Sequence, residues 1–364
     1  MFGATFAERA TAAGKKCLVL ERRGHIGGNV YTEEVSGIHV HKYGAHIFHT
    51  RNEAVWRYVN RFAQFKPYIH SPVANYNGRL FNLPFNMNTF YQMWGTVTPE
   101  EAGARIENDR LSAFVQNPKN LEEAAINLVG RELFETLVRG YTEKQWGRKC
   151  ADLPADIIRR LPLRFTFDNC YFDDPFQGIP CGGYTAMVAR MMEGADIELC
   201  ADFLANKAYY QRQAKHTLFT GPIDEYFGYA HGPLAYRSVT FEQTLLDMEN
   251  YQGVAVMNYT DAKTPFTRII EHKHFDPQNQ AKTIISREYS REWAVGIEPY
   301  YPIEDGANKA LYRKYADIVP REKNLHFGGR LGAYRYFDMD QTIKQALELS
   351  RAFGCFSQSP LPII

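Results

Sequence analysis

The first 28 residues constrain the fold most strongly, because a helix, a strand, an acid and a glycine pair follow one another there. Residues 1–10 are typical of a helix that Gly14 ends. Residues 16–21 are typical of a buried parallel strand ending in a carboxylate, and a loop with Gly27 and Gly28 follows. This order forms the second half of a dinucleotide-binding unit, whose acid binds a ribose hydroxyl. The sequence therefore predicts an α/β fold with a Rossmann-like domain.

The first half of that unit, a strand and a glycine-rich turn, has no counterpart in the chain. Gly3 matches the last glycine of the G-x-G-x-x-G fingerprint, but the two earlier glycines are absent. We therefore interpret the chain as truncated at its N-terminus. We expect the natural protein to begin roughly ten residues upstream, which is the length of one strand and a turn.

Two further kinds of segment are predicted beyond this start. At 364 residues the chain exceeds the roughly 250–300 at which a single core usually stops growing. Residues 86–162 are mostly helical in pattern, and Thr98 with Glu101 forms a capping box. We predict that the last of these helices starts near 152–154.

Alternating residues predict an antiparallel sheet in the second half of the chain. The four runs with period two are 234–242, 253–259, 268–275 and 283–289. Asn77-Gly78 predicts a type I′ turn in a hairpin over residues 68–82. A strand at 324–328 and a helix at 338–351 complete the chain.

Charge and cysteine content exclude several classes of function. The formal net charge is +1 and no basic stripe dominates, so we expect no nucleic-acid partner. The 6 cysteines form no C-x-x-C pair, which argues against zinc and fits a reduced, cytoplasmic protein. No apolar run approaches the roughly 18 residues of a membrane span.

A glycine pair, an arginine, two tyrosines and a carboxylate lie together in residues 327–338. Glycines let a backbone approach a flat ligand closely, because they have no Cβ. Asp338 with Gln341 has the pattern of a capping box, so a helix with free N–H groups starts there. The combination predicts an electron-rich, anionic ligand, such as a reduced flavin beside a phosphorylated substrate.

Four histidines fall within residues 39–49, which raises the possibility of a metal site. No carboxylate completes a ligand set, so we predict no metal and consider packed or solvated histidines the alternative. His46 differs from the others because Gly44 and Ala45 precede it. Small residues there allow the imidazole to press against a flat partner.

The candidate anion-binding residues are arginines. Arg159, Arg160, Arg164 and Arg268 are the candidates, since a planar guanidinium makes two charge-assisted bonds to a diphosphate. A surface cation or a structural ion pair is the alternative for each of them. Tyrosines in the same regions supply phenolic donors, although core packing explains most tyrosines in proteins.

Taken together, these runs closely resemble bacterial UDP-galactopyranose mutases, and the match spans nearly the whole chain in order. The matching residues are Glu21-Arg22 and the runs 25–29, 41–50, 81–86, 140–147, 164–169, 267–275 and 327–331. Runs of this length are far more specific than a glycine fingerprint.

The resemblance implies three domains around a noncovalently bound FAD. We expect a Rossmann-like FAD-binding domain at 1–60, 177–222 and 322–354, and a helical domain with a mobile lid at 84–165. An antiparallel sheet domain is expected at 61–83, 166–176 and 223–321. A cytoplasmic homodimer and a role in cell wall polysaccharide biosynthesis are also implied.

The resemblance also implies roles for individual residues. Arg160 and Arg268 would grip the diphosphate, and His46 would lie beside the flavin near its reactive nitrogen. The residues expected to bind substrate are Tyr141, Trp146, Tyr171, Asn258, Tyr301, Tyr336 and Asp338. The residues expected to bind FAD are Gly3, Glu21, Arg22, Gly27, Gly28, Asn29, His46 and Arg330.

The implied reaction interconverts UDP-galactopyranose and UDP-galactofuranose without net redox change. In the family, N5 of the reduced flavin attacks the anomeric carbon of the sugar while UDP leaves. Two alternatives stay open: an FAD-dependent oxidoreductase of the same fold, and an inactive fragment that binds a nucleotide sugar.

Overall fold

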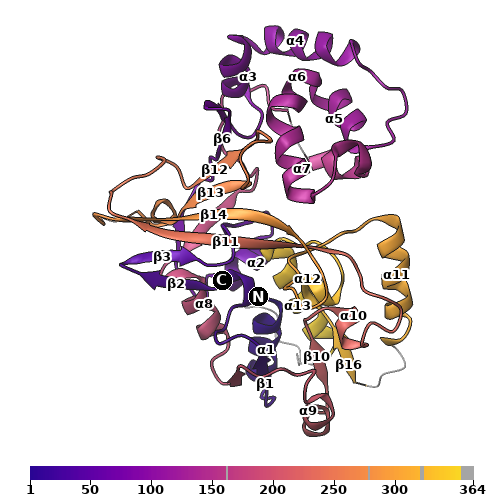
Figure 1. The fold of residues 1–364 in the computed structure, drawn as a ribbon. Helices are drawn as coiled ribbons and strands as arrows, with labels where there is room; N and C mark the ends of the chain where they lie inside the picture. The colour runs from indigo at the N-terminus through magenta and orange to yellow at the C-terminus, as the bar shows by residue number, and fades with distance from the viewer. Residues whose placement is uncertain (161–162, 278, 320–323, 354–364) are drawn as a thin grey trace.

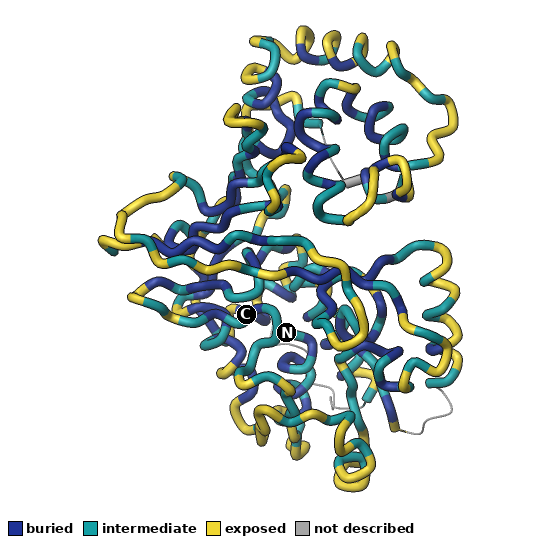
Figure 2. The backbone as a smooth tube through the Cα atoms, viewed as in Figure 1, coloured by how far each residue is buried: buried dark blue, intermediate teal, exposed yellow. Residues whose placement is uncertain are grey.

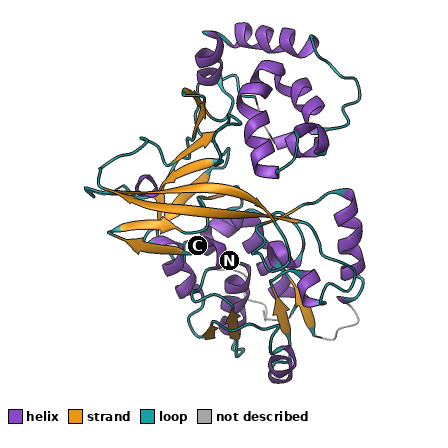
Figure 3. Cartoon of the chain, in the orientation of Figure 1, coloured by secondary structure: helices purple, strands orange, loops and turns teal. Residues whose placement is uncertain are grey.

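The elements of the protein form three groups, as Figures 1 and 3 show: helices at the top, a large sheet across the middle, and mixed helices and strands below. The computed structural model describes residues 1–160, 163–277, 279–319 and 324–353. The mixture of a helix–strand unit, a helical group and a multi-stranded sheet confirms the predicted fold class. The domain boundaries given above stay a prediction.

The lower group contains two small parallel sheets with helices packed beside them. β1 (Leu18–Glu21) pairs with β9 (Asp196–Leu199), and β10 (Thr217–Phe219) pairs with β16 (Leu325–Phe327). The helix α1 (Phe2–Ala12) packs on α13 (Met339–Ala352) and α8 (Gly183–Met191). A Cβ on Gly328 would lie 2.2 Å from the ring of Phe2, so the backbone after β16 touches the start of α1.

The predicted strand at 16–21 is present as β1, but it is not buried as expected. Leu18 is 41% exposed, and every residue of β9 is exposed. Parallel strands are normally covered on both faces and by neighbours on both edges. Within the described residues β1 pairs on one edge alone, with β9, which explains the exposure.

The middle of the molecule is a seven-stranded sheet, called the large sheet below, with the order β15-β11-β14-β13-β12-β6-β7. Its pairs are antiparallel except that β12 and β6 run parallel. The strands are β6 (Val73–Tyr76), β7 (Arg79–Asn82), β11 (Tyr236–Leu246), β12 (Val256–Tyr259), β13 (Arg268–Glu271), β14 (Thr283–Glu292) and β15 (Tyr301–Pro302).

Two of the sequence predictions for this sheet can be compared directly. Asn77 and Gly78 both have positive φ, 52° and 86°, which confirms the type I′ turn. The strand predicted at 268–275 is wrong in its second half, because it ends at Glu271 and His272–Phe275 forms the 3-10 turn η5. Hydrogen bonds from the backbone of Tyr251 and Gln252 to the Glu271 carboxylate hold the chain where the strand ends.

The helical group sits on the β6–β7 end of the large sheet. Its apolar core includes Phe90, Leu121 and Phe134 and reaches Ala74 and Phe81 of the hairpin. Figure 2 shows buried stretches of these helices in dark blue. The helices are α3 (Met87–Trp94), α4 (Pro99–Leu111), α5 (Leu121–Val129), α6 (Arg131–Leu133), the π-helical η2 (Phe134–Arg139) and α7 (Gly140–Trp146). Thr98 and Glu101 form the predicted capping box.

The regular helix predicted to start near 152–154 is replaced by two short 3-10 turns. These are η3 (Cys150–Asp152) and η4 (Ala155–Arg160), with Pro154 between them. Residues 161–162, within the helical domain predicted at 84–165, lie outside the described part of the chain.

The remaining elements complete the fold. They are η1 (Gly28–Val30), β2 (Thr32–Val35), β3 (Ile38–His41), β4 (Phe48–Thr50), α2 (Glu53–Val59), β5 (Phe65–Pro67), β8 (Phe176–Pro180), α9 (Lys207–Gln213), α10 (Ile223–Tyr226), α11 (Gly306–Ala316) and α12 (Gly329–Gly332). Among the described residues, each helix is too short or too polar to cross a membrane.

Candidate active site

Arg268 on β13 is held by partners from two other elements. It lies directly across from Glu288 on β14, and its Nε is 3.1 Å from Glu288 Oε1. Its Nη2 donates a hydrogen bond to the hydroxyl of Tyr141 on α7. In the described part of the chain, Nη1 of Arg268 has no hydrogen-bond partner. The guanidinium is therefore fixed on one side and free to bind an anion on the other.

Four tyrosines predicted to bind substrate gather around this arginine. The Arg268 charge acts on Tyr141, Tyr171 and Tyr301, and the ring of Tyr301 lies 6.1 Å from that of Tyr336. Burial raises the pKa of Tyr141 to about 12, and it also raises the pKa of Tyr171 and Tyr301. These three phenols are therefore protonated at neutral pH and can donate hydrogen bonds to an anion.

Two of the remaining predicted substrate residues, Asn258 and Asp338, lie beside this cluster. Asn258 on β12 faces Arg268 in the sheet register, and its Oδ1 is buried without a partner among the described residues. Asp338 caps α13 through the predicted capping box with Gln341, and its charge acts on Tyr171. Trp146, at the end of α7, packs on the helical core. The backbone of Arg160 ends η4, but its side chain is outside the described residues, so its role stays a prediction.

The residues predicted to bind the cofactor lie around the carboxyl ends of the parallel strands. Glu21 ends β1, Gly3 is in the first turn of α1, and Arg330 is in α12. Burial lowers the pKa of His46 to about 4, and the nearby positive charge of Arg330 contributes. An acid, a cation and a helix start in one place fit a dinucleotide.

This group adjoins the tyrosine cluster at two points. The guanidinium of Arg330 lies 4.4 Å from the ring centre of Tyr336. A Cβ on Gly44, in the loop that carries His46, would lie 3.8 Å from Glu288 Oε2. The structure thus places two of the predicted cofactor residues, Arg330 and His46, next to the tyrosine cluster and Glu288.

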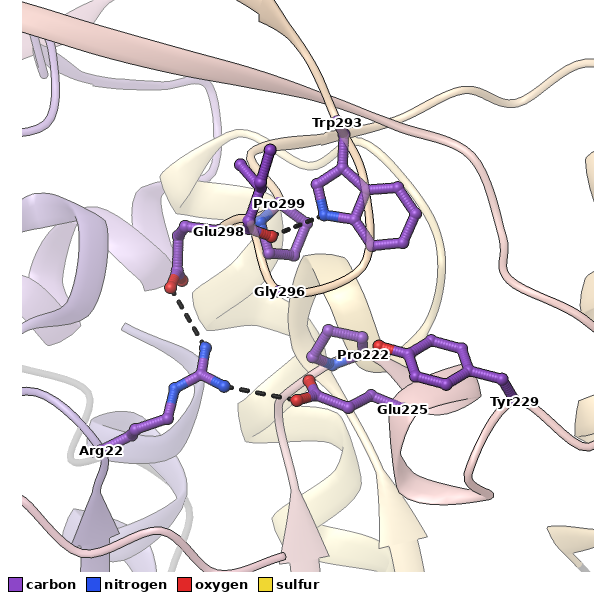
Figure 4. A pocket seen from close by; sticks show the side chains of 9 residues that line it. Arg22, Pro222, Glu225, Tyr229, Trp293, Gly296, Glu298 and Pro299 are labelled. Atoms are coloured by element: carbon purple, nitrogen blue, oxygen red, sulfur yellow. Dashed lines mark hydrogen bonds and ion pairs between the residues drawn. The ribbon is translucent and has the colours of Figure 1, made fainter.

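Arg22, Asn29 and the two loop glycines have surroundings of their own. Arg22 makes ion pairs with Glu225 (3.3 Å) and Glu298 (3.1 Å), as Figure 4 shows. The backbone N–H of Arg23 donates to Glu21, and its Nη2 donates to Asn29 Oδ1. Gly27 and Gly28 have positive φ, which lets the loop turn at the end of β1.

A cavity of about 280 Å³ opens beside Arg22, and Arg268 is not among the residues that line it. Arg22 is the predicted site residue that lines it, together with Glu225 and Glu298 (Figure 4). Its other lining residues are Pro222, Tyr229, Trp293, Gly296, Ile297 and Pro299. Both carboxylates pair with Arg22, and Glu298 also pairs with Arg23 (2.8 Å), so the charges of these two carboxylates and two guanidinium groups balance.

Sequence reasoning missed Glu288 and Lys144. Glu288 lies inside an alternating run, so its face could be inferred, but its pairing with Arg268 depends on strand register. Lys144 donates to the carbonyl oxygens of Tyr259, Thr264 and Phe266, at 2.7, 3.1 and 3.1 Å. It thereby ties α7, which carries Tyr141, to the β12–β13 turn.

The replacement Lys144→Met is expected to destabilise the protein by about 2 kcal/mol, because three carbonyl groups lose a charged donor. Burial lowers the pKa of Lys144 to about 8, so the ammonium form prevails at pH 7. We also expect faster amide hydrogen exchange over residues 140–147, since the clamp on α7 is released. Urea unfolding and exchange mass spectrometry measure both effects. Lys149→Met, at an exposed position, is the control, and equal unfolding midpoints for the two variants would contradict the clamp.

Comparison with known proteins agrees with this architecture. A family model described as UDP-galactopyranose mutase matches residues 136–336, and one described as an NAD(P)-binding Rossmann-like domain matches residues 1–62. A probable UDP-galactopyranose mutase of Klebsiella pneumoniae is 41% identical over 99% of this chain and 95% of its own length. A dTDP-fucopyranose mutase of Escherichia coli is 37% identical over 96% of this chain and 95% of its own length.

A solved structure supports the fold independently. The crystal structure of a reduced UDP-galactopyranose mutase matches 98% of this chain and 94% of its own chain with a TM-score of 0.73, at 15% identity. The family model covers more than half of the chain, and the Klebsiella relative aligns along nearly all of it. The chain therefore belongs to the UDP-galactopyranose mutase family and is an isomerase.

Proposed function

We propose that this chain interconverts UDP-galactopyranose and UDP-galactofuranose with a bound, reduced FAD. The observation that carries the proposal is the junction of the two residue groups, at Arg330 with Tyr336 and at Gly44 with Glu288. A diphosphate held by Arg268 would place its sugar next to the ring of a cofactor held by Arg330 and His46. Family membership supports the same assignment.

In its reduced form FAD supplies a nucleophilic N5 for the anomeric carbon, which the oxidised ring lacks. The residues of the chain act on the diphosphate that leaves the anomeric carbon. Arg268 stabilises the negative charge that grows on the diphosphate as the anomeric bond breaks. The protonated hydroxyls of Tyr141 and Tyr301 add hydrogen bonds to that charge. Neutral His46 can accept a hydrogen bond without adding positive charge beside the flavin.

The experiment is product analysis with UDP-galactofuranose and FAD, in the presence and absence of dithionite. We expect UDP-galactopyranose with dithionite, little product without it, and many turnovers for each reductant equivalent. An oxidoreductase of the same fold would instead consume reductant in proportion to product. A fragment that only binds the nucleotide sugar would form no product in either arm.

A second arm of the experiment tests the nucleotide sugar. The Escherichia coli relative is a dTDP-fucopyranose mutase, so dTDP-fucofuranose is offered under the same conditions. Turnover of the fucose compound alone would show that the substrate assignment is wrong while the reaction type is right. The homodimer and the cytoplasmic location stay predictions, which sedimentation and fractionation can test.

A further inference from the structure

A line of histidines connects the loop that carries His46 to the large sheet. The backbone N–H of His46 donates to Nδ1 of His41 (3.1 Å), and the backbone N–H of His41 donates to Nδ1 of His272 (3.2 Å). The Nε2 of His272 lies 2.8 Å from the hydroxyl of Ser286 on β14. His41 and His272 are 2% and 1% exposed, so water does not compete for these bonds.

The direction of these bonds fixes the proton positions on two of the rings. A backbone N–H can only donate, so Nδ1 of His41 and Nδ1 of His272 are acceptors without a proton. A neutral imidazole has one N–H, and in His272 it is the Nε2–H that donates to Ser286. Burial lowers the pKa of His272 to about 3 and that of His41 well below its usual value, so both rings are neutral.

The same argument gives the opposite tautomer for His46. Its Nδ1 lies 2.8 Å from the carbonyl oxygen of Gly44, which can only accept, so Nδ1 carries the proton. Its Nε2 then has a free lone pair, and no hydrogen bond to that atom is present in the described part of the chain. The groups that act on the ring are Arg330 and the amino end of α1, with His41 and Tyr184 in ring contact.

The position of His41 is explained by its role as an acceptor. Its ring stacks on Phe275 at 4.6 Å, a contact that a phenylalanine would also make. Its Nε2–H is buried without a partner among the described residues, and that burial costs free energy. A phenyl ring would avoid this cost but could not accept the N–H of His46. The loop is also constrained at Gly44, where φ is 105° and an added Cβ would lie 3.4 Å from the ring of Phe241.

We propose that His41, held by His272, is a positioning residue that fixes the turn at residues 44–46, so that His46 keeps its proton on Nδ1 and presents Nε2 as an acceptor to an N–H donor of the cofactor. The identity of the cofactor, a flavin, rests on the proposed function. The tautomer of His46 does not, because the protein alone sets it.

The test compares His41→Asn with His41→Phe in the chain without cofactor. Ring nitrogen NMR shifts of labelled histidine report the tautomer of His46, and the His46→Gln spectrum assigns its signals. We expect the proton on Nδ1 in the wild type and in His41→Asn, whose Oδ1 replaces the Nδ1 acceptor. In His41→Phe we expect both tautomers to be populated. A proton on Nε2 in the wild type, or an unchanged tautomer in His41→Phe, would overturn the proposal.

A second measurement separates this inference from the proposed function. His41→Phe should weaken the binding of reduced FAD about tenfold more than that of oxidised FAD, the scale of one hydrogen bond. A tenfold difference of this kind corresponds to a two-electron midpoint potential of the bound flavin that is about 30 mV lower in His41→Phe than in the wild type. If His41→Phe does not fold, His272→Phe removes the next acceptor and should mix the tautomers in the same way. If the wild type binds no FAD, the proposed function fails and the NMR result alone decides the role of His41.

Discussion

Replacing Arg268 with alanine should lower kcat by about 100- to 1,000-fold, the usual loss when one preorganised charge contact is removed. The guanidinium is held by Glu288 and Tyr141 before any ligand arrives, so little reorganisation is needed when the diphosphate gains charge. Its effect is therefore larger in the transition state than in the ground state. Steady-state rates with UDP-galactofuranose and reduced FAD measure the change.

Two further variants make this result specific. Arg268→Lys keeps the charge but loses the planar fork that reaches Glu288 and the ligand together, so we expect an intermediate rate. Arg291→Ala, at an exposed position of β14, is the control and should behave as the wild type. Because Arg268→Ala leaves the buried Glu288 unpaired, melting curves must show that the variant is folded at the assay temperature. A folded Arg268→Ala with a wild-type kcat would show that the diphosphate is bound elsewhere.

The second large effect is expected on stability, from Glu271→Ala, at about 3–5 kcal/mol. Glu271 is 0% exposed, and its carboxylate accepts from the backbone of Tyr251 and Gln252 (both 2.8 Å) and from Thr283 (2.7 Å). Its Oε2 also lies 3.1 Å from Nε2 of His274. Alanine leaves the buried hydroxyl of Thr283 and the two backbone N–H groups without this partner. Urea unfolding at pH 7 measures the loss. Glu249→Ala, at an exposed position in the loop that contains Tyr251 and Gln252, is the control.

The effect of Glu271 depends on pH in a direction that its pKa defines. Burial raises the pKa of this carboxyl, but hydrogen bonds from His274, Thr283 and two backbone N–H groups outweigh it and lower the pKa to about 2. In the unfolded chain the pKa of glutamate is about 4.3. The carboxylate therefore contributes its full stability above about pH 5 and loses it progressively as the pH falls toward 2.

Glu271→Gln isolates the charge from the shape of the side chain. We expect a loss of about 1.5–3 kcal/mol at pH 7, the scale of hydrogen bonds to a charged group. The difference between this variant and the wild type should shrink between pH 5 and pH 2. A difference that stays constant over that range would mean that the carboxylate is not the source of the stability.

Local sequence patterns were sufficient where neighbours along the chain decide the structure. Asn77-Gly78 adopts the predicted turn because both residues tolerate positive φ. Thr98 and Asp338 start helices because each caps a backbone N–H within its own first turn. The start of α1 and the acid at the end of β1 could likewise be predicted from the sequence, since helix and strand periodicity are local properties.

Partners distant in the sequence could not be derived in this way. Glu288 faces Arg268 because β13 and β14 pair in one register, and a shift of one residue would have turned Glu288 to the other face. The parallel pairing of β12 with β6 joins segments about 180 residues apart, and alternation alone does not distinguish it from an antiparallel pair. The same limit explains why 272–275 was predicted as strand.

The amino-acid order by itself thus determined the family and the fold class, and it supplied the candidate residues of the site. The tertiary structure decided which of them touch: the carboxylate that holds Arg268, the clamp of Lys144 on α7, and the histidines behind His46. The physical reason is that helix caps and turns are set by bonds within a few residues. The charge and proton state of a buried group, by contrast, depend on whatever the folded chain places beside it.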